Sequence, residues 1–340
     1  MIAASVIMIN RNGGAGLFDA LRTCRADLEA CWREDPCFEM IVVDNGSTDD
    51  SLRVIDAELQ GAAFPWRCIS EPVAGVNFSR NTGLRAARGS LLIFTDSDLH
   101  FRSGWLRAYL AAARAYPDVD VFAGRIRIGS RPDTLPRWVD LDGPYRRTSI
   151  VVQVDYGDEP RVLPMTDGNG PAGPSMAFRR QIFERHGEFD TRFGLRPGSL
   201  VPGAESEFCD RLSRAGLQFA YAADAVVDHP VRASQLSRAY FLRRLHGVGR
   251  VLARTQRKHG EKARRVLWLK PYLVRQTLVA AARYGASFLQ SSPQKRFYYL
   301  CELSKQVGQI HEDFCEWYAA LREGRRPDAE ADIKTGANPA

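Results

Sequence analysis

The sequence has few of the features that would place it in a specialised class. Its seven cysteines are odd in number and include no Cys-x-x-Cys pair, which argues against a disulfide framework and a zinc ribbon and indicates a reducing compartment. No window of about 18 residues is free of charged side chains, so we expect no membrane-spanning helix. The apolar run at residues 2–9 has no basic segment before it and is too short for a signal peptide. We also find no internal repeat.

What is present is the composition of a globular protein, with 45% hydrophobic and 26% charged residues. The charge is unevenly placed. Residues 233–340 carry 20 Lys and Arg against 9 Asp and Glu, whereas residues 1–232 carry 27 against 31. A slightly acidic N-terminal part and a basic C-terminal part predict two regions with different partners.

Hydrophobic periodicity predicts strands and helices in alternation over roughly the first 125 residues. The expected strands lie at 5–9, 40–43, 68–70, 91–94 and 119–128, and the expected helices at 15–32, 51–59, 78–87 and 105–116. Strands that alternate with helices at this spacing form βαβ units. The sequence therefore predicts an α/β fold with a mostly parallel sheet flanked by helices.

Beyond this stretch the pattern changes twice. Residues 129–174 are rich in Pro, Gly and Asp, as is typical of loops that border a binding site. Order resumes with expected strands at 175–178, 219–222 and 225–227 and a helix at 206–215, and only helical periodicity remains from Gln235 onward. We expect an α/β domain at 1–232, a basic helical region at 233–325 and a disordered tail at 326–340.

Carboxylates follow two of the predicted strands. Asp44 comes directly after one strand, and Asp96 and Asp98 come directly after another. Side chains just beyond the carboxyl ends of parallel strands line a ligand crevice. There, Asp96 and Asp98 can reach a divalent cation and the ribose or phosphates that the cation accompanies. Asp44 can accept hydrogen bonds from a nucleobase or ribose. A turn followed by a helix cap is the ordinary alternative for both segments.

Three other residues are candidates by position. Arg80 lies near the start of a predicted helix, where a guanidinium can bind a diphosphate or a base carbonyl. Glu205 lies where a loop enters a helix, a suitable place for a carboxylate that accepts a proton. His229 ends a strand-like run and can ligate a metal. The ordinary alternatives are a surface arginine, acidic enrichment at a helix N-terminus and a structural histidine.

The order and spacing of these segments resemble the family-2 glycosyltransferases, which have the GT-A fold. The resemblance covers about residues 3–232. It rests on SVIMINRN (5–12), FEMIVVDNGSTDDS (38–51), GVNFSRNTGLRAARGSLLIFTDSDLHF (75–101), AGPSMAFRRQIFERHGEFDTRFG (172–194), GAESEFCDRLSRAGL (203–217) and YAADAVVDHPV (221–231).

The resemblance implies a metal-dependent donor site. It implies that the nucleotide-sugar donor, a UDP-sugar in our expectation, is bound by Asn10, Asp44, Arg80 and Asp96. It also implies that Mn²⁺ or Mg²⁺ is held by Asp98 and His229.

The resemblance further implies an inverting single displacement. In it, Glu205 deprotonates a hydroxyl of a glycan or lipid-linked acceptor, which then attacks the anomeric carbon of the donor. Glu207 is close enough in sequence to be the alternative base. The alternative function is a non-catalytic GT-A-like subunit of a polysaccharide assembly complex.

The basic helical region has three candidate roles. Its helices can pack against the α/β domain and shape the acceptor site. Aromatic residues such as Trp268 and Phe288 stand among Lys270, Arg275 and Arg283, as in helices that bind an anionic membrane surface. Nucleic acid is the weakest candidate, because no nucleic-acid-binding signature accompanies the charge. The cysteines indicate a reducing compartment and the basic helices suit an anionic lipid surface. Together they lead us to expect a cytoplasmic protein, with a peripheral position on the inner face of the cytoplasmic membrane.

Overall fold

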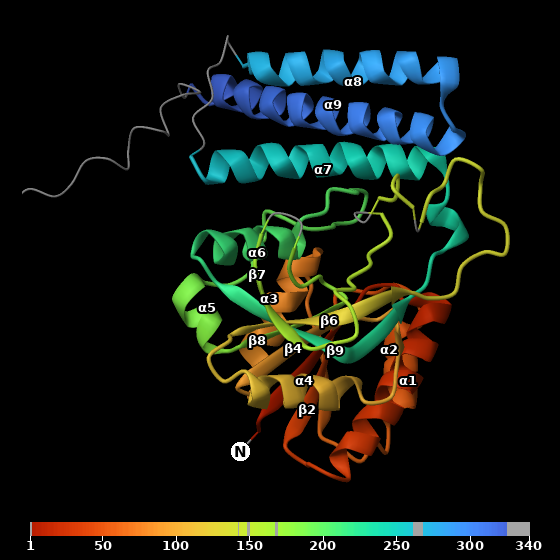
Figure 1. Ribbon diagram of the computed structural model, residues 1–340. Helices are drawn as coiled ribbons and strands as arrows, with labels where there is room; N and C mark the ends of the chain where they lie inside the picture. Colours follow the sequence, from red (N-terminus) through yellow and green to blue (C-terminus); the bar gives the residue numbers. More distant parts are fainter. Residues whose placement is uncertain (1, 142, 148–149, 167–168, 261–267, 325–340) are drawn as a thin grey trace, which may run out of the picture. The chain divides into compact units, whose positions relative to one another are not determined.

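The computed structural model describes residues 2–141, 143–147, 150–166, 169–260 and 268–324 (Figure 1). The chain divides into two compact units. The first comprises Met1–Pro132, Val151–Ser199 and Gly203–Arg232, and the second comprises Asp133–Ile150, Leu200–Pro202 and Ala233–Ala340. Two segments expected in the α/β domain, 133–150 and 200–202, thus group with the C-terminal helices. The predicted tail at 326–340 lies outside the described residues.

The first unit is built on one mixed sheet with the strand order β3-β2-β1-β4-β8-β6-β9-β5, and β7 pairs with β9. Its bounds are β1 Ala4–Asn10, β2 Phe38–Asp44, β3 Trp66–Ser70, β4 Leu91–Asp96, β5 His100–Phe101, β6 Val121–Ile128, β7 Arg161–Pro164, β8 Ser175–Arg179 and β9 Gln218–His229. Strands β1 to β4 are parallel, β8 runs antiparallel between β4 and β6, and β9 is parallel to β6. The α/β fold with a mostly parallel sheet is confirmed.

The sequence expectations need one correction and three additions. The two runs expected as separate strands at 219–222 and 225–227 form the single strand β9, whose register against β6 shifts at Gly124/Arg125. The exposed Asp224 interrupts the apolar run where this irregularity lies. The strands β5 and β7 and the short helix α5 (Gln181–His186) are too brief to produce a periodic signal.

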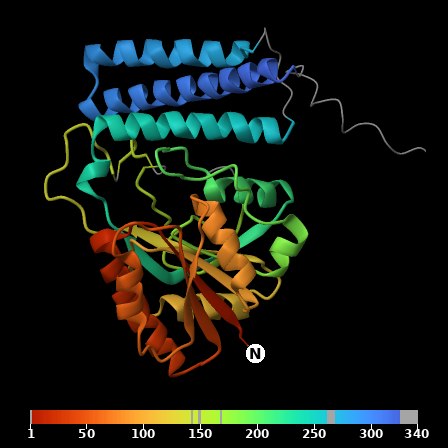
Figure 2. The same ribbon diagram turned by 180° about the vertical axis from the view of Figure 1, so that it is seen from behind.

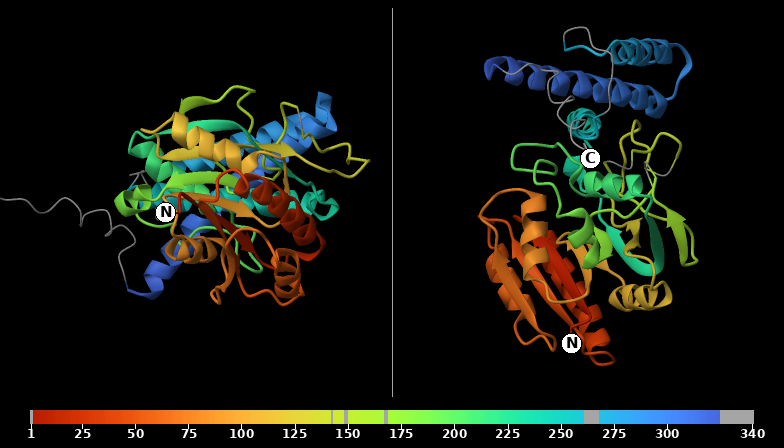
Figure 3. Two further views of the ribbon diagram at one scale, coloured as in Figure 1. Left: turned by 90° about the horizontal axis from the view of Figure 1, so that it is seen from below. Right: turned by 90° about the vertical axis from the view of Figure 1, so that its left-hand side faces the viewer.

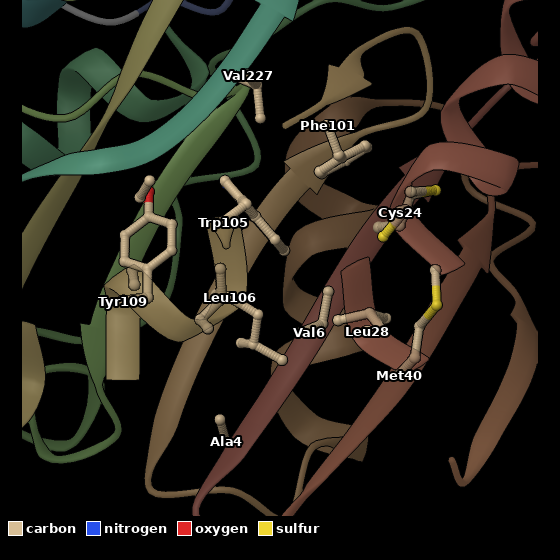
Figure 4. Close-up of a cluster of buried hydrophobic side chains, with 14 of the residues drawn as sticks. Ala4, Val6, Cys24, Leu28, Met40, Phe101, Trp105, Leu106, Tyr109 and Val227 are labelled. Atoms are coloured by element: carbon tan, nitrogen blue, oxygen red, sulfur yellow. The ribbon is translucent and has the colours of Figure 1, made fainter. Parts of the chain in front are cut away.

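Helices cover both faces of this sheet (Figures 1 and 2). One hydrophobic cluster joins the sheet to α1 (Gly14–Trp32), α2 (Ser51–Leu59) and α4 (Trp105–Ala115); the other joins it to α3 (Val76–Ala86), α5 and α6 (Ala204–Arg214). The alternation of β1 supplies both clusters, since Val6 and Met8 face the first and Ile7 faces the second. Figure 4 shows part of the first cluster, to which α4 contributes Trp105, Leu106 and Tyr109 and β1 contributes Val6.

The second unit contains the short 3₁₀ helix Ala233–Gln235 and three long helices, α7 (Arg238–Lys258), α8 (Pro271–Gln290) and α9 (Pro293–Arg322). Helix α9 lies between α7 and α8 (Figure 3). The segment 133–150 is anchored to this unit by Trp138, whose ring packs 5.3 Å from Phe241 and 4.3 Å from Phe297 between centroids. Within the described part of the chain, no helix combines the length and apolar character needed to cross a bilayer.

Candidate active site

The carboxyl ends of three parallel strands bring the first site residues together. In the sheet register, Asn10 of β1 is paired with Asp44 of β2, and Ile9 is paired with Asp96 of β4. All three polar residues therefore lie at the same edge of the sheet, which is where open α/β sheets bind ligands. The sequence-based expectation of a shared crevice depended on this register.

Asp44 is buried within a hydrogen-bonded network. Its carboxylate accepts hydrogen bonds from Asn10 Nδ2 at 3.0 Å, from Ser47 Oγ at 2.6 Å and from the Ser47 backbone N–H at 3.0 Å. The other end of the Asn10 amide accepts a hydrogen bond from Ser97 Oγ at 2.8 Å. Asn10 thus links Asp44 to the Asp96-Ser97-Asp98 turn and fixes the orientation of both.

A second pairing brings Asp98 to His229. The two-residue strand β5 pairs with β9 so that His100 stands opposite Asp228, which precedes His229 in the chain. Asp228 is itself held by Arg102 of the loop after β5 and by Arg127 of β6. Asp98 lies close enough to His229 to oppose, in part, the lowering of the histidine pKa by burial.

This corner of the site has the donor set for a divalent cation. The Nδ1 atom of His229 is buried and has no hydrogen-bond partner among the described residues. Burial lowers the pKa of His229, so the imidazole is held in the neutral form that ligates metals. Asp98 supplies a carboxylate. No set of three or more His, Cys, Asp or Glu side chains is arranged for a metal within the described residues. Water and phosphate oxygens would complete the coordination, as is common for Mg²⁺.

Asp98 also has a partner that sequence reasoning missed. Arg232 Nη2 lies 2.7 Å from Asp98 Oδ2, with about half of the arginine side chain exposed. Gly16 of α1 borders this pair, because a Cβ there would lie 3.7 Å from Arg232 Nη2 and 3.8 Å from Asp98 Cβ. A metal at Asp98 would therefore compete with the guanidinium of Arg232.

Arg80 and Glu205 meet in the same cluster. Arg80 of α3 is buried, and its Nη1 atom lies 3.5 Å from Glu205 Oε2 at the start of α6. Desolvation raises the pKa of Asp96 to about 7; Arg80 opposes the shift, and Asp98 and Glu205 add to it. The candidates Arg80, Asp96, Asp98 and Glu205, from α3, the end of β4, the turn after it and α6, thus affect the pKa of Asp96 together.

The backbone around Arg80 and Glu205 leaves room for these side chains only because Gly173 has no Cβ. A Cβ at Gly173 would overlap Arg80 Nη2 and would lie 3.5 Å from the carboxylate of Glu205. The loop-rich stretch 129–174 therefore contributes Gly173 to the wall of the site; its composition indicated loops beside a binding site but not which residue would border it.

Two asparagines of α3 position the elements that carry this cluster. The amide of Asn77 donates hydrogen bonds of 3.0 Å to the backbone oxygens of Asp190 and Ala204. Asn81 exchanges two hydrogen bonds with the backbone of Phe189. Both asparagines are buried. Sequence reasoning missed them because polar residues in a helical segment are read as its solvent face.

The alternative base, Glu207, has a different environment from Glu205. Its side chain is fully buried, and Arg211 Nε lies 2.9 Å from its Oε1 atom. By contrast, 26% of the Glu205 side chain is exposed. The two glutamates lie on the first turn of α6, but only Glu205 joins the cluster with Arg80 and Asp96.

Comparisons with known proteins agree on a family. Residues 5–187 match the family model described as glycosyl transferase family 2. The uncharacterized glycosyltransferase YfnE of Bacillus subtilis is 36% identical over 96 residues, which are 28% of this chain and 23% of that protein. The glucosyl-dolichyl phosphate glucuronosyltransferase of Haloferax volcanii is 21% identical over 192 residues, or 56% of this chain and 58% of that protein. The chain thus spans about a quarter to somewhat over half of the length of these relatives.

One solved structure is similar over most of the chain. The mannosyltransferase PcManGT from Pyrobaculum calidifontis, in complex with GDP-Man and Mn²⁺, superposes with a TM-score of 0.53 and 18% identity. The superposition covers 93% of this chain and 86% of that one. At this level of identity, the likeness concerns the fold.

Proposed function

The chain belongs to glycosyltransferase family 2 and has a GT-A-type fold, and from this premise we propose that it transfers a sugar from a nucleotide-sugar donor to an acceptor hydroxyl. The donor that we propose is a UDP-sugar. The transfer is an inverting single displacement on a glycan or lipid-linked acceptor. The observation that carries this proposal is the convergence of Arg80, Asp96, Asp98 and Glu205 in one electrostatic cluster at the carboxyl edge of the sheet. Such a cluster suits a diphosphate, a cation and a proton acceptor together.

The donor is bound by residues from four elements: Asn10, Asp44, Arg80 and Asp96. The oriented carboxylate of Asp44 accepts hydrogen bonds from the nucleoside, which replace part of its present network with Asn10 and Ser47. Arg80 faces the diphosphate. Its Nε atom is buried without a hydrogen-bond partner in the described part of the structure, so an anionic ligand would satisfy a group that is costly to leave unpaired.

Asp98 and His229 would hold Mn²⁺ or Mg²⁺. A divalent cation there neutralises charge that develops on the departing nucleoside diphosphate. The Mn²⁺ in the PcManGT complex supports a divalent cation, and the Nδ1 atom of His229, which is buried without a hydrogen-bond partner among the described residues, supports this histidine as a ligand.

Glu205 acts as the general base. It takes the proton of the acceptor hydroxyl as that oxygen attacks the anomeric carbon and the bond to the diphosphate breaks. Its partial exposure lets an acceptor reach the carboxylate, whereas Glu207 is buried against Arg211. Arg80, 3.5 Å away, fixes the position of the Glu205 carboxylate before the acceptor binds.

The acceptor is a glycan or a lipid-linked glycan, met by a cytoplasmic protein at the inner face of the cytoplasmic membrane. The name of the Haloferax relative, a glucosyl-dolichyl phosphate glucuronosyltransferase, supports a lipid-linked acceptor. The basic composition of residues 233–340 supports a position near anionic lipid.

The test is release of nucleoside diphosphate from a panel of UDP-, GDP- and dTDP-sugars, with and without Mn²⁺. We expect one donor family to turn over slowly on water and faster with an added glycan or lipid-linked acceptor, and we expect Glu205→Gln to remove the acceptor-dependent part. Nucleotide binding without turnover of any sugar, across acceptors, would favour the non-catalytic subunit instead.

A further inference from the structure

Helix α8 is packed against its own unit along a narrow stripe. Among the side chains of α8 whose burial the structure describes, the buried ones are Leu273, Ala280 and Ser287, which recur every seven residues and so lie on one line along the helix. That line faces α9, the helix beside which α8 lies in Figure 3. Contact along one stripe leaves the opposite side of α8 uncovered.

The uncovered side of α8 is apolar. Leu278 is 65% exposed, Phe288 55% and Leu289 84%. Small residues fill the positions between them and are exposed as well: Ala281, Ala282, Gly285 and Ala286. The outward side of a helix in a soluble protein is normally polar, and a contiguous apolar surface of this kind marks an interaction site.

The charged side chains of α8 itself have one sign. Helix α8 contains Arg275 and Arg283, both exposed, and no Asp or Glu. Arg296 continues the basic rim at the start of α9, with its guanidinium 4.6 Å from the Phe288 ring. The nearest acidic residue along the chain within the described part, Glu302, is already paired with Arg147 at 2.6 Å and Lys305 at 2.8 Å.

We propose that this face of α8 binds the surface of an anionic lipid bilayer. The apolar side chains enter the boundary between head groups and acyl chains, while Arg275 and Arg283 extend to lipid phosphates. The arginines also decide against a second copy of this chain as the occupant. Two α8 helices packed face to face would bring four guanidinium groups together with no carboxylate in either helix to pair with them.

Vesicle co-sedimentation at low salt tests the surface directly. The wild-type protein is expected to bind phosphatidylcholine vesicles that contain phosphatidylglycerol, and to bind pure phosphatidylcholine far more weakly. Leu278→Glu combined with Leu289→Glu should lower the partition coefficient by about tenfold or more, because both side chains lose their favourable transfer from water. Arg275→Gln and Arg283→Gln should each lower it by roughly fivefold and reduce the preference for anionic lipid.

The matched control for each of the single substitutions Leu278→Glu and Leu289→Glu is Leu52→Glu, which places the same charge at a half-exposed leucine of α2 and should leave vesicle binding unchanged. All substitutions are at exposed positions, so unchanged circular dichroism and melting temperature are expected. No binding to anionic vesicles, or equal loss in the Leu52 control, would overturn the proposal. A concentration-dependent dimer that the Leu278 and Leu289 substitutions abolish, without vesicle binding, would overturn it in favour of self-association.

The exposed face of α8 would be the part of the protein that holds it at the membrane. This inference rests on the peripheral location proposed above. The two can fail separately. Vesicle binding reports on α8, whereas turnover and nucleotide binding report on the cluster around Arg80 and Asp98.

Discussion

The guanidinium of Arg80 lies 3.5 Å from the carboxylate of Glu205, although the two residues are 125 positions apart in the chain. Arg80 is buried in α3, and Glu205 is partly exposed at the start of α6. The same arginine also faces Asp96 at the end of β4. One buried cation thus connects the residue that we propose as base with the residues that we propose as donor ligands.

Replacement of Glu205 by Gln removes the proton acceptor and keeps the shape of the side chain. We expect the rate of transfer to fall by about 10²- to 10⁴-fold, the usual contribution of a general base, while the affinity for nucleoside diphosphate is retained. The rate is measured with saturating donor and acceptor, and affinity by calorimetric titration.

Glu207→Gln is the matched control on the same turn of α6. It removes one charge of a buried pair with Arg211, so we expect a loss of about 1–3 kcal/mol in the free energy of unfolding and a nearly normal rate for the folded fraction. Full activity of Glu205→Gln together with an inactive but stable Glu207→Gln variant would reverse the assignment of the base.

The wall formed by Gly173 can be tested by adding one methyl group. Gly173→Ala places a Cβ against Arg80 Nη2, and we expect the displaced guanidinium to weaken nucleotide binding by about tenfold, the equivalent of 1.4 kcal/mol. Gly170→Ala is the control, since the nearest atom to its Cβ is Met165 Cε at 3.8 Å. Equal affinities in the two variants would show that Arg80 does not contact the nucleotide.

The ion pair between Arg232 and Asp98 predicts competition with the metal. Without nucleotide, Arg232→Gln should bind Mn²⁺ more tightly than the wild type, by up to about fivefold, because a partly exposed ion pair is worth about 0.2–1 kcal/mol. Titration of free Mn²⁺ by electron paramagnetic resonance measures this without any enzymatic turnover. Weaker Mn²⁺ binding in the variant would mean that Arg232 positions the Asp98 carboxylate for the metal and does not compete with the metal for it.

Asn77 and Asn81 separate a general loss of stability from a specific loss of function. Both side chains are buried and each makes two hydrogen bonds to the backbone, so Ala at either position should lower the free energy of unfolding by about 1–3 kcal/mol. Only Asn77 contacts Ala204, the residue before Glu205. We therefore expect Asn77→Ala to slow transfer more than Asn81→Ala, measured well below the melting temperature of both. Equal rates would indicate that α6 is positioned by its hydrophobic packing alone.

Much of the first unit could be predicted from local sequence signals. The helix at Ser51–Leu59 has the expected bounds. The predicted C-terminal ends of the three strands lie within three residues of the observed ends at Asn10, Asp44 and Asp96. Helix α1 has one buried face and repeats its apolar residues at the helical period, whereas β2 is buried along its whole length and reads as a short apolar run. The candidate carboxylates follow such strands, and so their common edge could be anticipated.

What could not be predicted depends on contacts between distant segments. Insertion of β8 antiparallel between β4 and β6 leaves no mark on the residues of β8 themselves. The segment 133–150 belongs with the helices because Trp138 packs on Phe241 and Phe297, and no local pattern records that pairing. Arg232 and Gly173 were missed for the same reason, since their roles depend only on which atoms lie beside them.

The central claim is a metal-assisted nucleotide site at Asp98, and a thermal-shift panel of UDP, GDP, dTDP and ADP with and without Mn²⁺ tests it most directly. A ligand at about one hundred times its Kd stabilises the native state by about 2.7 kcal/mol, so we predict a rise of about 5 °C or more in Tm for one nucleotide. The rise should require Mn²⁺ and should be lost in Asp98→Ala. No shift with any nucleotide, or an equal shift in Asp98→Ala, would contradict the account.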